Sequence, residues 1–313
     1  MRIPQARGPV SGWTAQTLRG RSAPPPQIPD NVVRDADTQL ALWMIYELTY
    51  RGFEDTDADE WHPELVALRT GIERRFETQL RHVTDVPQPA DDLAQQLLDL
   101  AESAQGPSVA RFLQRQATAD QMRDYLRERS VQQLKESDPH SFVLGRLDGP
   151  AKTALAELQY DEYGSGSAQR LHARLYAEAM TAAGLDPTYG SYLGQVGATT
   201  LASANVMSMF ALNRRLRAAS MGHLAMFEAT CSVPCRRIAG GLARLGFPDT
   251  VAAYFEEHIE ADAVHEHLAA RDICANLEAE LHTDVLFGAQ VCGYLDGLLA
   301  EDLLRRWGMA VAS

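Results

Sequence analysis

The chain has 313 residues, of which 45% are hydrophobic and 23% charged, a composition ordinary for a globular protein with a buried core. Its formal net charge of −13 disfavours nucleic acid as a partner, because phosphate groups attract basic surfaces. The sequence contains no apolar run of about 18 residues that would predict a membrane span. The first residues also lack the apolar core of a secretory signal. We therefore expect a cytoplasmic protein that binds neither nucleic acid nor a membrane.

The first part of the chain divides into an arm and a helical region. Residues 1–29 carry four arginines, no acidic residue and the run Ala23-Pro24-Pro25-Pro26, which predicts a disordered or loosely attached arm. Residues 30–124 are predicted to form a packing or dimerisation region. The apolar periodicity indicates a helix that starts at Asp37 and includes Leu40 to Leu48, helices over about 63–83 and 90–104, and a fourth helix over about 108–134.

Glycine and proline divide the second half, residues 125–313, into further helices. The predicted helices span about 150–161, 168–183, 191–217, 219–245, 248–278 and 281–306. No segment alternates apolar and polar residues in the manner of a half-buried strand. The sequence therefore predicts an all-α bundle, a class in which metal sites commonly lie between facing helices.

One predicted helix presents a possible metal-binding stripe. His258, Asp262 and His265 follow the spacing i, i+4, i+7, which brings three side chains to one helical face. Imidazole nitrogens and a carboxylate together suit iron, manganese or zinc. The alternative is a solvated charged face, since the flanking residues include several glutamates.

A second candidate pair is Glu162 and His172. Ten residues separate them, which in a straight helix corresponds to a rise of about 15 Å. A bend at Gly164 and Gly166 would bring the two side chains toward one site, because helices bend at glycines. The alternative is that Glu162 is a surface acid and His172 an ordinary core or surface histidine.

Taken together, these segments resemble the haem-oxygenase-like diiron oxygenases, a family of iron-containing redox enzymes. The resemblance covers about residues 125–300. It rests on four segments in a specific order, namely Lys135-Glu136-Ser137-Asp138-Pro139, Asp161-Glu162-Tyr163-Gly164-Ser165-Gly166 with His172, Gly222-His223-Leu224-Ala225-Met226-Phe227-Glu228, and His258-x3-Asp262-x2-His265. It implies a haem-oxygenase-like helical bundle with an added N-terminal helical segment.

The resemblance also implies a set of metal ligands. Each ligand would lie on a core helix, with Glu136 on the first of them. One iron would be held by Glu136, His172 and His265, and the other by Glu162, His258 and Asp262. No further catalytic or cofactor-binding residue is implied.

Glu228 resembles an additional carboxylate found in the N-oxygenase branch of this family. Its presence favours oxidation of an amine nitrogen over other reactions of the family. The alternative is a buried acid that pairs with Arg236 or Arg237.

The family implies two Fe(II) ions, dioxygen as co-substrate, an electron donor, and a small amine or amino acid as substrate. We expect a homodimer, with the helix that contains Glu47 serving packing or dimerisation rather than metal binding. Two alternatives stay open. One is a diiron desaturase, C–C lyase or oxidative decarboxylase that acts on an amino or fatty acid, and the other is a metal-free scaffold or binding module.

Overall fold

The computed structural model describes residues 1–103 and 106–310, and of residues 260–263 it describes the backbone alone. Within these ranges every regular element is helical, which confirms the predicted all-α fold. The α-helices are α1 (Pro9–Thr17), α2 (Ala36–Tyr50), α3 (Pro63–Val83), α4 (Leu93–Ser103), α5 (Val109–Arg115), α6 (Ala119–Gln133), α7 (Asp138–Ser141), α8 (Gly149–Glu162), α9 (His172–Ala182), α10 (Ala198–Leu212), α11 (Arg217–Leu245), α12 (Asp249–His267) and α13 (His282–Arg306).

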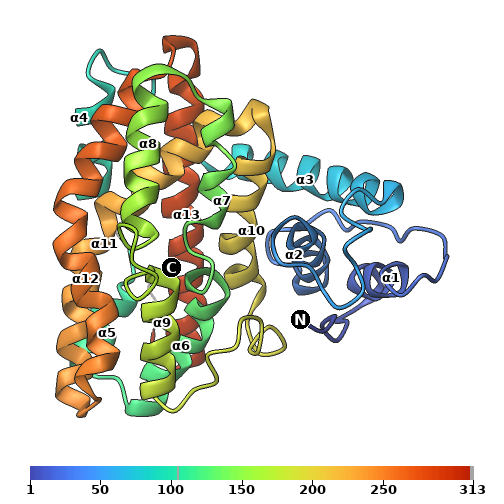
Figure 1. Cartoon of the computed structure of the whole chain (residues 1–313), viewed down its shortest axis with the longest axis horizontal. Helices are drawn as coiled ribbons and strands as arrows, with labels where there is room; N and C mark the ends of the chain where they lie inside the picture. Colours follow the sequence, from blue (N-terminus) through green and yellow to red (C-terminus); the bar gives the residue numbers. More distant parts are fainter. Residues whose placement is uncertain (104–105, 311–313) are drawn as a thin grey trace.

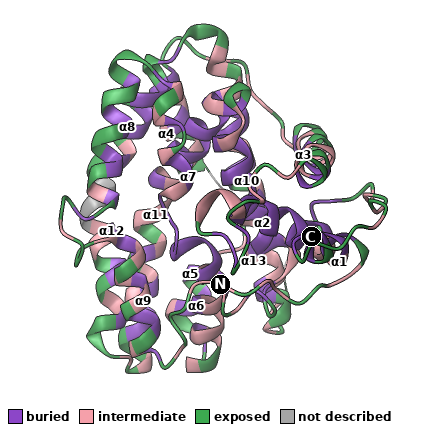
Figure 2. Cartoon of the chain, turned by 45° about the vertical axis from the view of Figure 1, so that its right-hand side comes forward, coloured by how far each residue is buried: buried purple, intermediate pink, exposed green. Residues whose placement is uncertain are grey.

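The helices form a long bundle with a smaller group beside it (Figure 1). Helices α4–α13 build the bundle, and α1, α2 and α3 lie together next to α10. Helix α10 is apolar or small on all its faces, a pattern typical of a fully enclosed helix. It lies between α2 and the bundle, and Figure 2 shows both α2 and α10 as buried elements. One apolar core therefore joins the N-terminal helices to the bundle.

Residues 1–29 differ from the predicted disordered arm. Val10 and Trp13 are buried on α1, which packs against α2. The Asp37 carboxylate accepts hydrogen bonds from the backbone N–H groups of Val10 and Ser11, at 2.8 Å each. These are N–H groups that a helix start leaves without internal partners. Apolar contact and this external cap together order a segment whose arginine and proline content suggested disorder.

Two predicted helices are interrupted. The single helix predicted over 108–134 is two helices, because Thr118 forms a capping box with Gln121 and begins α6. The helix predicted over 248–278 ends at His267, and a π-helical turn, Leu268–Ile273, follows it. The predicted domain boundary at residue 124 stays a prediction, although α4 and α5 pack against α11 of the bundle.

Helices α11 and α13 cross at unusually short range. A Cβ atom on Gly222 would overlap the carbonyl group of Val285, and one on Gly288 would overlap the carbonyl group of Ala219. The two glycines therefore allow backbone to approach backbone. This close crossing sets the depth at which α11 presents its side chains to the bundle interior.

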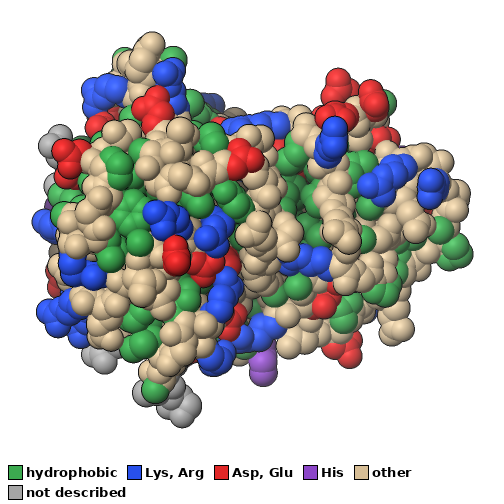
Figure 3. All heavy atoms as spheres, turned by 90° about the horizontal axis from the view of Figure 1, so that it is seen from below, with side chains coloured by type: hydrophobic (Ala, Val, Ile, Leu, Met, Phe, Trp, Pro, Cys, Tyr) green, Lys and Arg blue, Asp and Glu red, His purple; other side chains and the backbone are tan. Residues whose placement is uncertain are grey.

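The described helices include none that combines the length and the apolar character needed to cross a membrane. On the face shown in Figure 3, acidic and basic side chains are interspersed rather than separated into patches of one sign.

Candidate metal centre

Glu136 lies just after the C-terminal end of α6, in the turn that leads to α7, and not on a helix as the resemblance implied. Its carboxylate is buried and receives hydrogen bonds from the Gln133 amide at 2.8 Å and the Tyr254 hydroxyl at 2.9 Å. Gln133 also donates to the Tyr254 oxygen at 2.7 Å. The turn thus presents a carboxylate whose orientation is held from two helices.

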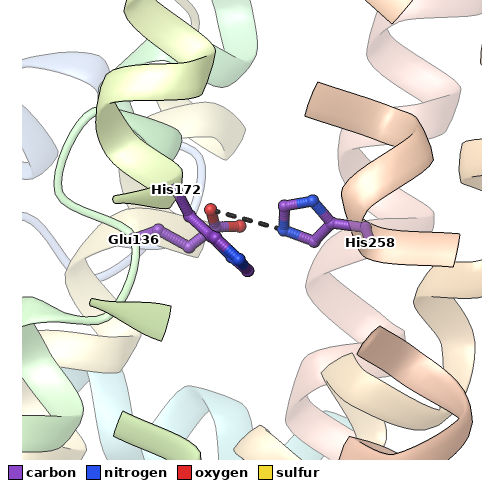
Figure 4. Close-up of side chains that lie close together, drawn as sticks. All are labelled: Glu136, His172 and His258. Carbon is purple, nitrogen blue, oxygen red and sulfur yellow. Dashed lines mark ion pairs between the residues drawn. The ribbon is translucent and has the colours of Figure 1, made fainter. Parts of the chain in front are cut away.

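Two imidazoles face Glu136 (Figure 4). His258 Nε2 lies 3.6 Å from Glu136 Oε2, while its Nδ1 lies 2.8 Å from the backbone oxygen of Tyr254. That hydrogen bond places a proton on Nδ1 and leaves Nε2 directed at the carboxylate. The His172 ring packs against the His258 ring with centroids 4.6 Å apart. Glu136, His172 and His258 therefore form one compact group of donors.

A second group lies next to the first. His265 Nδ1 is 3.6 Å from Glu162 Oε1 and 3.6 Å from Glu228 Oε2, and all three side chains are buried. His265 Nε2 is directed to the opposite side, 3.5 Å from the half-exposed Asp161 carboxylate. Each group offers three donor atoms that lie within 4.8 Å of one another.

Glu162 connects the two groups. Its Oε1 faces His265, and its Oε2 lies 3.1 Å from His172 Nδ1 and accepts a hydrogen bond from the Ser137 hydroxyl at 2.7 Å. This arrangement depends on the turn between α8 and α9, where Gly164 and Gly166 adopt φ angles of +78° and +83°. The predicted bend at these glycines is present, and it brings Glu162 and His172 together.

The structure distributes the histidines differently from the expected pairing. His258, and not His265, joins Glu136 and His172, while His265 joins Glu162 and Glu228. The reason is that the two histidines are seven residues apart on α12, or about 10 Å along the helix axis. Each histidine therefore contacts the donors that lie at its own position along the axis of α12. The side chain of Asp262 lies outside the described residues.

Glu228 points toward the donors rather than toward an arginine. Arg236 donates to the Ser232 hydroxyl at 2.8 Å, and Arg237 lies near the Ser108 hydroxyl. The buried Glu228 carboxylate has His265 as its partner. The interpretation of Glu228 as a simple arginine-paired acid is therefore wrong.

The centre has the features of a site built for cations. A void of about 10 Å³, which has room for about one water-sized particle, lies among Glu136, Glu162, Glu228 and His258. The nitrogens His258 Nε2 and His172 Nδ1 are buried there without a well-aligned hydrogen bond in the described part of the chain. Unpaired buried polar atoms are costly, and a metal ion would satisfy both. Imidazole and carboxylate donors without thiolates fit iron.

The charges of the donors are strongly coupled. Burial alone would raise the pKa of Glu162, but the adjacent His172 and His258 lower it to about 2. Burial would lower the pKa of His265, but Glu228 and Glu162 raise it to about 9. Without a cation the carboxylates thus hold protons on the histidines, and a bound metal would replace those protons.

Three supporting residues were absent from the predicted site. Tyr254 and Gln133 hold Glu136, and Ser137 holds Glu162. Tyr254 precedes His258 by four residues, so helical spacing alone would have placed it on the same stripe. Ser137 gave no comparable signal, because its partner Glu162 lies 25 residues away on another helix. Gln133 lies three residues before Glu136, but its second partner, Tyr254, is 121 residues away.

The donors lie within a segment that is similar to known proteins. Residues 123–296, more than half of the chain, match the family described as iron-containing redox enzymes. The chain belongs to this family. This membership, together with the donor set, indicates an oxidoreductase that uses iron.

One known protein is similar to this iron-containing redox enzyme in sequence, and another is similar in structure. A nitrosourea synthase from Streptomyces achromogenes subsp. streptozoticus is 30% identical over 152 residues, which cover 48% of this chain and 32% of the relative. The similarity thus spans about a third of that protein's length. A CADD-like protein of unknown function from Nostoc punctiforme PCC 73102 superposes with a TM-score of 0.55 and 15% identity, over 73% of this chain and 98% of that one. This likeness confirms the haem-oxygenase-like fold.

Proposed function

We propose that this chain is a non-haem diiron oxygenase that uses dioxygen to oxidise the nitrogen of an amine or an amino-acid-derived substrate. The observation that carries the proposal is the pair of buried donor groups, Glu136–His172–His258 and Glu162–Glu228–His265, joined through Glu162. Two adjacent sets of three donors match two metal ions better than one, since a single catalytic zinc uses about three protein ligands. Asp262 stays a predicted seventh ligand from its spacing.

The protein would hold, orient and shield the metals. Tyr254 fixes His258 through its backbone oxygen and Glu136 through its hydroxyl, so one residue orients two ligands. Leu158, Leu224 and Phe227 line the same void and limit the access of water. When bound, a ferrous pair supplies electrons with which dioxygen is reduced, and an external electron donor would restore them.

The choice of nitrogen oxidation has two supports. Glu228 belongs to the second donor group, as expected for the N-oxygenase branch. The nitrosourea synthase, by its name, forms a product with an N–N bond, and its similarity covers about half of this chain. Desaturation, C–C cleavage or oxidative decarboxylation of an amino or fatty acid is the alternative for the same ligand set.

The experiment that tests the proposal begins with anaerobic Fe(II) loading and metal analysis. We expect about two irons per chain, one for each donor group. His258→Ala and His265→Ala should each lose iron and oxygen consumption, whereas His267→Ala, with an exposed side chain on the same helix, should lose neither. An oxygen pulse with candidate amines should then give products with oxygen on nitrogen, detected by mass spectrometry.

Two results would contradict the proposal. Full iron content in both His258→Ala and His265→Ala would show that these histidines are not metal ligands. Products that have lost hydrogen or carbon, with no oxygen on nitrogen, would keep the metal site but assign the enzyme to the alternative reactions.

A further inference from the structure

Two cysteines of α11 lie in sulfur contact near the metal centre. Cys231 Sγ is 3.5 Å from Cys235 Sγ, and both side chains line an open cavity of about 930 Å³. Cys231 is half-buried and Cys235 is buried, so Cys231 is the more accessible of the two to a molecule that enters the cavity. The metal ligands of the proposed function include no cysteine, so the site described above gives this pair no role.

Cys235 lies near the donor group that contains Glu136. It packs in the same apolar cluster as Tyr254, whose hydroxyl donates to Glu136. Burial and the adjacent Glu136 carboxylate raise the pKa of Tyr254 well above its usual value, and the two nearby thiols add to that rise. Burial by itself would lower the pKa of His258, but the carboxylates around it, and to a smaller extent Cys235, raise it well above its usual value. The thiol pair therefore lies close to a proposed iron ligand and to the tyrosine that orients this ligand.

The helix between the two cysteines can tighten enough for a disulfide to form. In a regular helix, Cβ atoms four residues apart are separated by about 5–6 Å, whereas a disulfide needs about 3.5–4.5 Å. Pro234 lies within this interval of α11. It has no N–H to donate to the Thr230 carbonyl, and its ring opposes that carbonyl. One of the hydrogen bonds that hold a helix at its regular pitch is therefore missing where the backbone has to move.

The other two cysteines of the chain differ from this pair. Cys274 and Cys292 are buried, and burial raises the pKa of each thiol. A thiol that stays protonated is slow to react with oxidants, because the thiolate is the reactive form. Oxidation is therefore expected first at Cys231 and Cys235, where the more accessible sulfur has a second sulfur as its neighbour.

We propose that Cys231 and Cys235 form a redox-active dithiol that supplies two electrons to the metal centre and becomes a disulfide. The inference deepens the proposed function and rests on it for the electron acceptor. Formation of the S–S bond releases two electrons and two protons, and two ferric ions take up those electrons as they return to the ferrous state. Two external thiols, or one dithiol, then reduce the disulfide by exchange, first at Cys231 because Cys235 is buried.

The first part of the test uses the metal-free protein, so it does not depend on oxygenase activity. The reduced protein is equilibrated without oxygen in glutathione buffers of increasing oxidised fraction, then denatured, alkylated and digested with trypsin. Cys231 and Cys235 share the tryptic peptide 218–236, whereas Cys274 and Cys292 share the peptide 272–305. We expect peptide 218–236 to become lighter by two hydrogen atoms and to take up no alkyl group, while peptide 272–305 is alkylated on both of its cysteines.

The second part uses protein that has been loaded with Fe(II) and separated from other reductants. One pulse of dioxygen is given in the presence of catalase, which removes hydrogen peroxide, and Mössbauer spectroscopy then follows ferrous and ferric iron. We expect the unaltered protein to regain ferrous iron as peptide 218–236 gains its disulfide. Cys231→Ser and Cys235→Ser should lose this recovery and keep ferric iron. Cys292→Ser, which alters a cysteine of the same cavity outside the pair, is the matched control and should recover as the unaltered protein does.

Three results would overturn the proposal. One is that peptide 218–236 keeps both thiols in every glutathione buffer, a result that needs neither iron nor a variant. Another is that dioxygen converts the iron to the ferric state while both thiols remain, which would leave the proposed function intact and exclude the dithiol as its electron source. The third is that the protein binds no iron, or that dioxygen leaves the iron ferrous, which would contradict the proposed function and remove the acceptor of the electrons with it.

Discussion

Lys135 Nζ lies 3.3 Å from Glu47 Oε2, and the two side chains are 3% and 0% exposed. Glu47 belongs to α2, and Lys135 immediately precedes Glu136 of the metal centre. Tyr189 donates a hydrogen bond to Glu47 at 2.7 Å, and Arg51 donates one to the backbone oxygen of Leu134 at 3.0 Å. Helix α2 thus contacts the non-helical turn that presents Glu136.

The first prediction concerns this buried ion pair. Glu47→Gln should destabilise the protein by about 3–5 kcal/mol, because it leaves the Lys135 ammonium group without its counter-charge in the core. The double variant Glu47→Met with Lys135→Met should recover most of that loss, since it removes both charges. Denaturant unfolding of the unaltered protein, the single variants Glu47→Met and Lys135→Met and the double variant measures the coupling. Losses that simply add would show that the pair does not interact.

Tyr254 should control metal affinity without being a ligand. Tyr254→Phe removes the hydroxyl that donates to Glu136 but keeps the backbone oxygen that orients His258. Loss of such a supporting hydrogen bond typically costs about 10–100-fold in metal affinity. Titration with Fe(II) or Co(II) measures it. Tyr176→Phe is the control, because its hydroxyl donates to Leu126 while its ring packs against Tyr254. Equal affinities in the two variants would exclude this role.

The crossing of α11 and α13 should tolerate no side chain at Gly222. Gly222→Ala forces the added methyl group against the carbonyl of Val285 and should cost about 1–3 kcal/mol or more. Gly293→Ala on α13 meets no atom within 4 Å and should instead stabilise the helix by up to about 1 kcal/mol. Thermal unfolding compares them. A stabilised Gly222→Ala would mean that the helices separate at no cost.

Acid should destabilise the metal-free protein partly through His223. Burial lowers the pKa of His223 to about 3, so between pH 7 and pH 5 the unfolded chain binds a proton that the folded protein does not. That difference reduces the free energy of unfolding by about 2 kcal/mol for one histidine as pH falls over this range. His223→Gln should show a correspondingly smaller decrease, and His267→Gln, with an exposed side chain, should behave as the unaltered protein. An unchanged pH dependence in His223→Gln would show that this histidine is not buried in its neutral form.

The sequence by itself determined the helical class and most of the chemistry of the site. Apolar periodicity located α3 as Pro63–Val83, and the spacing of His258 and His265 indicated a ligand-bearing stripe on α12. These features are local, since a helix repeats every 3.6 residues whatever surrounds it. The glycines after Glu162 indicated the bend, because they lack the side chain that disfavours a positive φ.

Only the tertiary structure decided which donors meet. Periodicity gives the face of α12 on which His258 and His265 lie, but the level at which each reaches its partners depends on how α8, α9 and α11 pack. Likewise, nothing near Glu47 in the sequence points to Lys135, 88 residues away. A buried charge is stable only when a partner of opposite charge lies beside it, and long-range packing brings the two together.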